Sequence, residues 1–342
     1  MSRLGVVINP TAGRGRGSEV GSAVLSVLRR RGHTVEVLSA GSLAEATARA
    51  RHAAVAGLDA IVVVGGDGMS HLGANVVADT DLPLGIVAAG TGNDVSRSLG
   101  LPQSDVGASV RAIEHGLSEG PRRIDAVSAG PPDYSAREWF LGVLSCGFDA
   151  AVNARANTMT WPRGSARYVR AVAAELGRFT PYGYKVTLDD AVWESAGTVV
   201  AVANSSVFGG GIQIAPDARM DDGLLDIVVA GPFTKVGVVK IFPGMYAGRH
   251  VRHPAVQVFR SRTVLIEPDL RLGTAPPAAF ADGERLGPLS LRAEVHPGAL
   301  AVLVWPAPFP HPRRGFSGNV CARRAGFSDS REWLAAWSGE RG

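Results

Sequence analysis

The stretch that decides the fold is Ala60-Ile61-Val62-Val63-Val64-Gly65-Gly66-Asp67-Gly68, an apolar run of strand length that ends in a glycine-rich turn. Two other apolar runs end the same way: Leu4–Ile8 leads into Asn9-Pro10-Thr11-Ala12-Gly13, and Leu84–Ala89 leads into Gly90-Thr91-Gly92-Asn93-Asp94. Each run is too short for a helix and suits a strand that is buried on both faces of a parallel sheet. The turns at the carboxyl ends of such strands gather in one crevice, where ligands bind.

Glycines in the three turns also indicate the kind of ligand. They let backbone N–H groups approach closely, and the helices that follow favour anions at their N-termini. Three such turns at one crevice therefore predict several phosphates, and hence a nucleotide. The segment Gly13–Gly17 adds little by itself, because Ser18 replaces the third glycine of a dinucleotide fingerprint and a flexible turn before a helix is an equal alternative.

The composition is that of a globular protein without a disulfide framework. The chain has 342 residues, 46% of them hydrophobic and 19% charged, a net charge of +4, and two cysteines that show no metal-binding spacing. No run of eighteen apolar residues is present, which argues against a membrane-spanning helix. Because the first residues lead directly into a strand and a turn, we also expect no signal peptide. These features predict a soluble protein of the cytoplasm.

The first third of the sequence alternates strands with helices. Helices are predicted over Ser18–Arg31, from the capping box Ser42-Leu43-Ala44-Glu45 to Gly57, and around Ser104–His115. This alternation predicts an α/β domain with a doubly wound parallel sheet over residues 1–127, which would bind the nucleotide.

The sequence changes after about Asp125, where strand-like stretches follow one another. They are Trp139–Ser145, Tyr184–Leu188, Thr198–Ala203, Leu224–Ala230, Val256–Phe259, Thr263–Ile266 and Leu300–Trp305. Only Ser165–Phe179 and Thr234–Tyr246 have a helical pattern. We therefore predict a mainly antiparallel β-sandwich domain over residues 128–305, with a boundary near Ala126–Pro132 and a last strand that is free to return to the first domain. Residues 306–342 form a basic tail that we expect to be poorly ordered.

Acidic residues follow the predicted strands where phosphates would lie. A carboxylate at Asp67 would be repelled there unless a cation intervened, which points to Mg²⁺. Asp94, in the third turn, and Asp125, after the short run Arg122–Ile124, would lie on the same rim of the sheet. For each residue taken alone, an N-cap of a following helix is the alternative.

A second acidic pattern, Asp282-Gly283-Glu284, stands in the β-rich part of the sequence. If this segment is extended, both carboxylates point to the same face and form a pair that can accept a hydroxyl proton. The alternative is a hairpin turn, because Asp-Gly is a leading turn dipeptide.

Together these motifs resemble a known family. The three glycine-rich turns look like the signature of the diacylglycerol, sphingosine and ceramide lipid kinases. Gly209–Gly211 is similar to that family's glycine triplet, Ala215–Asp226 to its metal loop, and Asp282-Gly283-Glu284 to its catalytic Asp-Gly-Glu. The resemblance runs from about residue 4 to residue 305 and is nearest to the soluble bacterial diacylglycerol kinases. It implies a nucleotide domain of the NAD kinase and diacylglycerol kinase type, followed by a β-sandwich.

The resemblance also implies the cofactors, ATP and Mg²⁺, and the residues that hold them. ATP would contact the three turns at Asn9, Pro10, Thr11, Ala12, Gly13, Gly65, Gly66, Asp67, Gly68, Met69, Ser70, His71, Gly90, Thr91, Gly92 and Asn93. Asp67, Asp94 and Asp125 would organise the catalytic Mg²⁺, and Arg97 would help to hold that network or the phosphates.

Two further roles are implied in the β-rich domain. A second, structural metal ion would be bound by the Asp222 carboxylate and by the backbone carbonyls of Arg219 and Leu224. Asp282 or Glu284 would accept the proton of the substrate hydroxyl.

Two positions depart from the family's pattern. His71 stands where Asn or Glu is common. Met69 stands where Thr is usual and removes a hydroxyl, so we expect weaker or altered contact with ATP, but not its loss. The resemblance still predicts an ATP-dependent lipid kinase that phosphorylates the hydroxyl of diacylglycerol to give phosphatidic acid. The alternatives are a kinase for another lipid alcohol such as sphingosine or ceramide, an NAD kinase, which shares the Gly-Gly-Asp-Gly turn, and a catalytically silent nucleotide- or lipid-binding protein.

The partner of such an enzyme would be a lipid substrate at a membrane surface. Arg163, Arg167 and Arg170, which follow Trp161, form a basic stripe on a predicted helix. An ordinary solvated helix face is one interpretation, and contact with the inner face of the cell membrane is the other. We predict no nucleic-acid partner, and a homodimer is left open.

Overall fold

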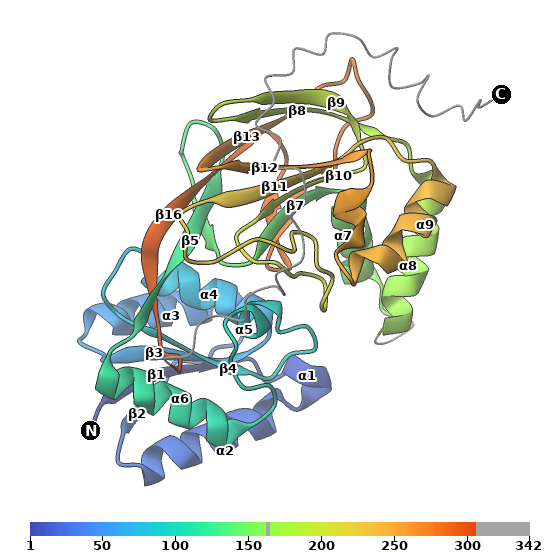
Figure 1. The fold of residues 1–342 in the computed structure, drawn as a ribbon. Coiled ribbons are helices and arrows are strands. Elements are labelled where there is room, and N and C mark those ends of the chain that lie inside the picture. The colour runs from blue at the N-terminus through green and yellow to red at the C-terminus, as the bar shows by residue number, and fades with distance from the viewer. Residues whose placement is uncertain (162–164, 306–342) are drawn as a thin grey trace, which may run out of the picture.

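The computed structural model describes residues 1–161 and 165–305. Its first part is an α/β unit at the bottom of Figure 1. The strands are β1 (Arg3–Ile8), β2 (Thr34–Val37), β3 (Ala60–Gly65) and β4 (Leu84–Ala88), which pair in parallel in the order β2-β1-β3-β4. The parallel sheet predicted from the apolar runs is therefore confirmed.

Helices cover both faces of this sheet. They are α1 (Ala12–Gly15), α2 (Gly17–Arg30), α3 (Leu43–Val55), α4 (Asp67–Val77), α5 (Asp94–Ser98) and α6 (Val106–Glu119). Figure 1 shows α2 and α6 on one side of the strands and α3 on the other. The capping box is present, since the Ser42 hydroxyl accepts a hydrogen bond of 3.2 Å from the backbone N–H of Glu45.

The first sheet continues into the β-rich part. Its further strands are β5 (Arg122–Gly130), β6 (Glu138–Phe140), β8 (Tyr182–Leu188), β9 (Val192–Gly197), β13 (Thr263–Pro268) and β16 (Leu291–Val302). Strand β16 pairs in parallel with β4 at Val302 and Leu84 and antiparallel with β13. Ten strands of the described part thus form one sheet that joins the two parts of the molecule.

A second, antiparallel sheet packs against this extension. Its strands are β7 (Val143–Gly147), β10 (Val199–Ala203), β11 (Leu225–Ala230), β12 (Val256–Ser261), β14 (Ala279–Ala281) and β15 (Glu284–Gly287), in the order β12-β11-β10-β7-β14-β15. Buried residues from both sheets, among them Phe140, Tyr184, Val202 and Ile227, form the core of the sandwich. The expected β-sandwich is confirmed.

Three helices and a short 3₁₀ helix cover the outer face of the second sheet. They are α7 (Phe148–Thr158), α8 (Ser165–Arg178), α9 (Lys235–Met245) and η1 (Arg249–Arg252). None of the helices in residues 1–161 and 165–305 is long and apolar enough to cross a bilayer. Of the predicted arginine stripe, Arg163 lies outside the described residues, while Arg167 and Arg170 donate to the backbone carbonyls of Met159 (3.5 Å) and Trp161 (3.2 Å).

Several predicted boundaries are wrong. The single strand expected over Trp139–Ser145 is two strands, β6 and β7, which belong to different sheets and are separated by Leu141 and Gly142. The strand expected to end at Ile124 runs to Gly130, because β5 pairs with β16 over most of its length. The predicted basic tail at residues 306–342 lies outside the described residues.

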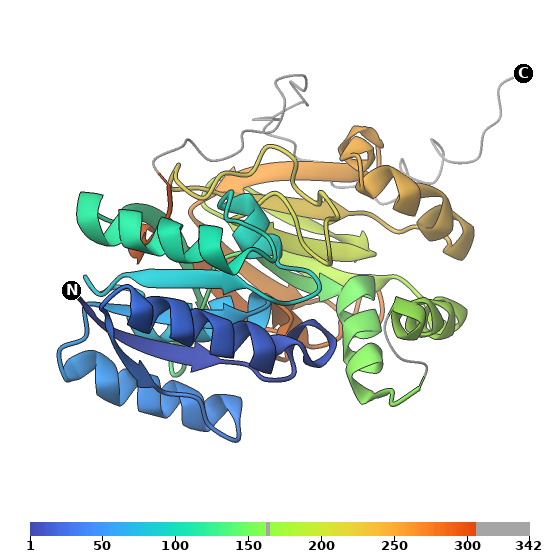
Figure 2. The ribbon, with the colours of Figure 1, turned by 90° about the horizontal axis from the view of Figure 1, so that it is seen from below.

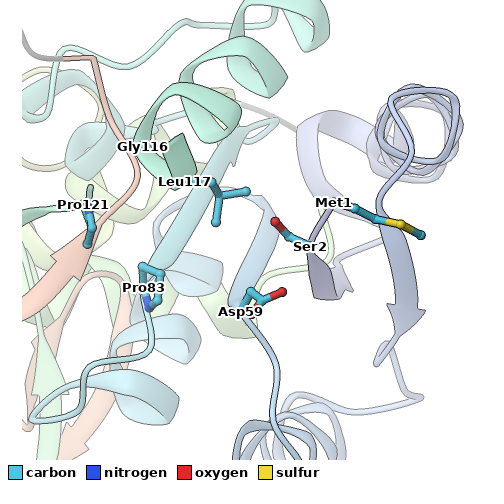
Figure 3. A pocket seen from close by; sticks show the side chains of 7 residues that line it. All are labelled: Met1, Ser2, Asp59, Pro83, Gly116, Leu117 and Pro121. Atoms are coloured by element: carbon cyan, nitrogen blue, oxygen red, sulfur yellow. The ribbon is translucent and has the colours of Figure 1, made fainter. Parts of the chain in front are cut away.

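One hollow of about 320 Å³ lies at the amino ends of the parallel strands. Figure 3 shows its lining: Met1, Ser2, Asp59, Pro83, Gly116, Leu117 and Pro121. Since Ser2, Asp59 and Pro83 directly precede or adjoin β1, β3 and β4, the hollow is at the edge opposite the glycine-rich turns. Ligands of such sheets bind at the carboxyl ends, so the functional site is expected at the turns.

Candidate active site

The three glycine-rich turns pack directly on one another. A Cβ atom added to Gly90 would lie 2.4 Å from the Cα of Gly66, and one added to Gly13 would lie 2.3 Å from the carbonyl oxygen of Ala89. These separations are far below normal contact distances, so no side chain fits between the backbones. The sequence therefore needs glycine at these positions to bring the three turns together.

Two asparagines hold the shape of the turns. The Asn9 side-chain oxygen accepts from the backbone N–H (3.0 Å) and the hydroxyl (2.8 Å) of Thr11. Asn93, which has a left-handed backbone (φ 57°), accepts from the N–H of Gly90 (2.9 Å) and donates to the carbonyl of Gly90 (3.1 Å). Pro10, Thr11 and Thr91 remain exposed at the rim.

The second turn opens helix α4, with Gly66 as its N-cap. Met69, Ser70 and His71, which were predicted to contact ATP, have buried side chains. Met69 packs against Gly65, where a Cβ would lie 2.3 Å from its Cγ. The unusual Met69 is thus a core residue, and what this turn can offer a phosphate is the helix N-terminus.

Asp67 and Asp94 lie on either side of Gly92. A Cβ on Gly92 would be 2.9 Å from Asp67 Oδ2 and 3.6 Å from Asp94 Oδ2. Asp67 accepts from the N–H of Val95 (3.0 Å), and Asp94 Oδ1 lies 3.9 Å from the Arg97 guanidinium but has no hydrogen-bond partner among the described residues. Burial, with the nearby charges of Asp94 and Asp282, raises the pKa of Asp67 to about 7.

This pair fits a divalent cation. Two buried carboxylates near one another repel, and one of their oxygens is left without a donor. Oxygen ligands of this kind suit Mg²⁺, which would relieve the repulsion. The structure therefore brings Asp67, Asp94 and Arg97 together at this point.

The glycine triplet connects this pair to the β-rich part. Gly209, Gly210 and Gly211 have φ values of +60°, +84° and +106°, a left-handed run that other residues rarely adopt. The N–H of Gly210 donates to Asp94 Oδ2 at 2.7 Å. The triplet thus turns the loop so that its backbone binds an acidic side chain 116 residues earlier.

Asp282 and Glu284 sit on the hairpin between β14 and β15. Asp282 and Gly283 have φ values of +51° and +87°, so the segment is the turn that we gave as the alternative, and the extended arrangement is wrong. The Asp282 carboxylate accepts from the N–H groups of Leu141 (2.9 Å) and Gly142 (2.8 Å), and its side chain is only 1% exposed. Asp282 is thus engaged by the backbone between β6 and β7.

Glu284 has different surroundings. A Cβ on Gly68 would lie 2.5 Å from Glu284 Oε1, which places this carboxylate directly against the second glycine-rich turn. Glu284 is half-buried, and among the described residues its carboxylate accepts no backbone hydrogen bond like those of Asp282. The hairpin therefore delivers a carboxylate to the turn even though its two acids are not equivalent.

His71 lies between two carboxylates. Its Nε2 is 3.3 Å from Glu138, and its Nδ1 is 3.7 Å from Asp282 Oδ2. Burial would lower the pKa of His71, but Asp282 and Glu138 together raise it to about 9. From the sequence, His71 was predicted to contact ATP and was noted as a departure from the family pattern. Its pairing with Glu138 and Asp282 was not predicted, because these residues are distant in the chain.

Asp125 belongs to a different group. Its carboxylate accepts from the N–H groups of Gly223 (2.7 Å) and Gly298 (2.9 Å), and its backbone N–H donates to the carbonyl of Met220. It lies within β5 and not after a strand end. The structure thus places Asp125 as an anchor of the loop at residues 220–223, away from the shared contacts of Asp67 and Asp94.

The same loop was predicted to hold a structural metal ion. The Asp222 carboxylate accepts from the N–H of Leu224 (3.1 Å) and is paired with the guanidinium of Arg260, whose Nε is 3.8 Å from Asp226. Arg219 pairs with Asp221 at 3.2 Å. The guanidinium of Arg260 thus already supplies a positive charge beside Asp222, so these residues do not fit a metal ion in this arrangement. In the described ranges, no three His, Cys, Asp or Glu side chains are grouped as a metal site.

Comparison with known proteins agrees with this geometry. Residues 3–129 match the "Diacylglycerol kinase catalytic domain" and residues 142–304 match the "YegS C-terminal NAD kinase beta sandwich-like domain". The chain is 34% identical over 305 residues to a diacylglycerol kinase of Mycobacterium tuberculosis (strain ATCC 25618 / H37Rv), covering 89% of this chain and 95% of that one.

A second relative is named as a lipid kinase, and a solved structure has a similar fold. A Chromohalobacter salexigens protein named "Probable lipid kinase YegS-like" is 29% identical over 65% of this chain and 70% of its own length. The crystal structure of a diacylglycerol kinase from Bacillus anthracis str. Sterne has the same fold, with a TM-score of 0.62 at 20% identity over 89% of this chain and 97% of that one. The chain therefore belongs to the lipid kinase family that includes bacterial diacylglycerol kinases and YegS-like lipid kinases.

Proposed function

We propose that this protein transfers the terminal phosphoryl group of ATP to the hydroxyl of diacylglycerol and so makes phosphatidic acid. The observation that carries the proposal is the meeting of three glycine-rich turns with two kinds of carboxylate: the Asp67–Asp94 pair around Gly92 and Glu284 against Gly68. A phosphoryl-transfer site needs a phosphate cradle, a place for a cation and an acceptor for the hydroxyl proton.

The nucleotide phosphates would lie over the turns, beside the N-terminus of α4 and the exposed Thr91. Mg²⁺ would be held by Asp67 and Asp94, where it would neutralise charge on the phosphates. Arg97, 3.9 Å from Asp94, would keep that carboxylate oriented or contact a phosphate directly.

We assign the role of general base to Glu284. A base must be able to accept a proton, and the Asp282 carboxylate is already committed to the two backbone donors at Leu141 and Gly142. Asp282 would instead fix the hairpin, so that Glu284 is held against the turn at Gly68.

The test is phosphorylation of a substrate panel with labelled ATP. Diacylglycerol, sphingosine and ceramide in mixed micelles, together with NAD in solution, are offered to the full chain and to a Glu284→Gln variant. We expect labelled phosphatidic acid from the wild type and a loss of label in the variant. Preferential labelling of NAD, or of another lipid alcohol, would replace the proposed substrate, and no turnover of any compound would indicate a silent binding protein.

A further inference from the structure

Helix α9 is apolar on two opposite faces. Its inner face, with Val238, Ile241 and Met245, packs on the outer side of the second sheet. Its outer face carries Val236, Val239, Phe242 and the adjoining Tyr246, which are 62%, 55%, 42% and 50% exposed. A helix that is apolar all round is normally covered on every side, so the outer face of α9 lacks a cover in the single chain.

Helical spacing gathers these four residues on one side. Val239, Phe242 and Tyr246 follow Val236 by three, six and ten residues. At 3.6 residues per turn, the four side chains lie within about a third of the helix circumference. The rings of Phe242 and Tyr246 are in edge contact, with centroids 5.7 Å apart. We define the α9 face as Val236, Val239, Phe242 and Tyr246.

The segment around the α9 face is purely basic. No Asp or Glu occurs between Asp226 and Glu267, whereas six basic residues do: Lys235, Lys240, Arg249, Arg252, Arg260 and Arg262. Lys240, within α9, and Arg249, in η1, are exposed. Two of the three lysines of the chain are in α9, so this helix combines exposed apolar side chains with positive charge.

Helix α8 extends this side of the molecule. Lys235 Nζ donates to the carbonyl of Gly177 in α8 at 2.6 Å, which ties the two helices together. Val169 in α8 and the preceding Trp161 are also strongly exposed. Figures 1 and 2 both show α8 and α9 on the same side of the molecule as α1, which follows the carboxyl end of β1 at the glycine-rich turns.

We propose that the α9 face inserts into the interface of a bilayer that contains anionic lipids, with Lys240 and Arg249 at the headgroups. An exposed apolar helix face with basic neighbours is the arrangement of helices that lie in a membrane interface. A second copy of the chain is a poorer cover, since a twofold interface would bring this acid-free segment, with its exposed Lys240 and Arg249, against itself. The proposal rests on the proposed function, because a lipid kinase must reach its substrate in a bilayer.

The experiment is flotation with vesicles in the absence of ATP. Phosphatidylcholine vesicles are compared with vesicles that also contain phosphatidylglycerol, at low and high salt. The test variants are the pair Val239→Ser with Phe242→Ser, and Lys240→Glu. The matched control is Val192→Ser with Leu270→Ser, two exposed apolar residues of the first sheet's β9 and of the chain after β13. Circular dichroism and Tm verify that each variant is folded.

We expect the wild type and the control to float with anionic vesicles at low salt and less so at high salt. The apolar pair and Lys240→Glu should each weaken binding at least about tenfold. Unchanged binding in the apolar pair would overturn the proposal. So would a wild-type dimer that this pair converts to a monomer without a change in flotation, because the face would then lie between copies.

Turnover of a short-chain, soluble diacylglycerol separates this proposal from the proposed function. If the α9 variants keep that turnover and lose flotation, both proposals are supported. If the wild type has no such turnover but floats through the α9 face, only the proposed function fails.

Discussion

The imidazole of His71 faces the carboxylate of Asp282, with Nδ1 3.7 Å from Oδ2, inside a site where Asp282 also accepts two backbone hydrogen bonds. The opposite ring nitrogen lies 3.3 Å from Glu138. His71 thus links helix α4 of the first part to β6 and to the hairpin between β14 and β15 of the second. Because both partners are acidic, this link depends on the charge of the imidazole.

His71→Asn should remove a stabilisation that depends on pH. The folded-state pKa of His71, about 9, is raised above its ordinary value of 6.5, so the stabilisation is fully present below pH 6.5 and is lost as the pH rises through 9. We expect the free energy of unfolding to fall by on the order of 2 kcal/mol at pH 6 in the variant. This figure is less than the full pKa shift of His71 implies, because the half-exposed Glu138 is screened by solvent. Urea unfolding of both proteins across this pH range measures it, and a difference that stays constant with pH would contradict the link.

Asp67→Asn should stabilise the metal-free protein and impair the reaction. The pKa of Asp67, about 7, is raised above the ordinary 3.8, so its ionised form destabilises the fold above pH 7 and this penalty vanishes below pH 4. At pH 8 in EDTA we expect Asp67→Asn to have a higher Tm than the wild type. The rise should be about 2–4 °C for each kcal/mol of this penalty that the substitution removes.

The same variant tests the cation site. Mg²⁺ should raise the Tm of the wild type more than that of Asp67→Asn, while phosphorylation of diacylglycerol falls in the variant. A lower Tm of the variant at pH 8, or equal Mg²⁺ shifts, would show that the Asp67–Asp94 pair is not a strained cation site.

Glu284→Gln and Asp282→Asn should fail in different ways. Glu284→Gln is expected to keep its Tm and lose about 10²-fold or more in kcat, the usual contribution of a positioned base. Asp282→Asn offers one acceptor to the two N–H donors of Leu141 and Gly142, so it should lose about 1–3 kcal/mol of stability. Kinetics and thermal unfolding distinguish the two, and a stable but inactive Asp282→Asn with an active Glu284→Gln would give the base role to Asp282.

The parts of the site that the sequence predicted are local ones. Gly66, Gly90 and Gly13 stand in short turns after apolar runs, and both the turns and their convergence follow from the rules for parallel sheets. Contacts between residues that are distant in the chain could not be predicted from such local patterns. Gly210 meets Asp94 over 116 residues, and Asp282 meets Leu141 over 141, because the hairpin and the triplet loop are placed by the packing of two sheets.

Strand register explains why Asp125 lies inside β5 and not after a strand end, and why Arg260 pairs with acids that the sequence did not connect to it. The apolar run after Arg122 ends at Ile124, but β5 continues because β16 supplies a partner strand to Gly130. Arg260 lies opposite Asp226 in the register of β11 and β12, and only this pairing brings its guanidinium to Asp222. The patterns of these antiparallel strands do not show which of them become neighbours.

The last prediction concerns this arginine and the loop that the family resemblance assigned to a metal ion. If Arg260 supplies the positive charge, Asp222→Ala should show the same Mg²⁺-dependent rise in Tm as the wild type. Arg260→Gln should lower the Tm in EDTA, since Asp222 and the buried Asp226 then face each other without a cation. Mg²⁺ should recover part of that loss in Arg260→Gln and none of it in the double variant with Asp222→Ala. A Mg²⁺-dependent rise that is smaller in Asp222→Ala than in the wild type would instead place the structural metal ion in this loop, beside the arginine.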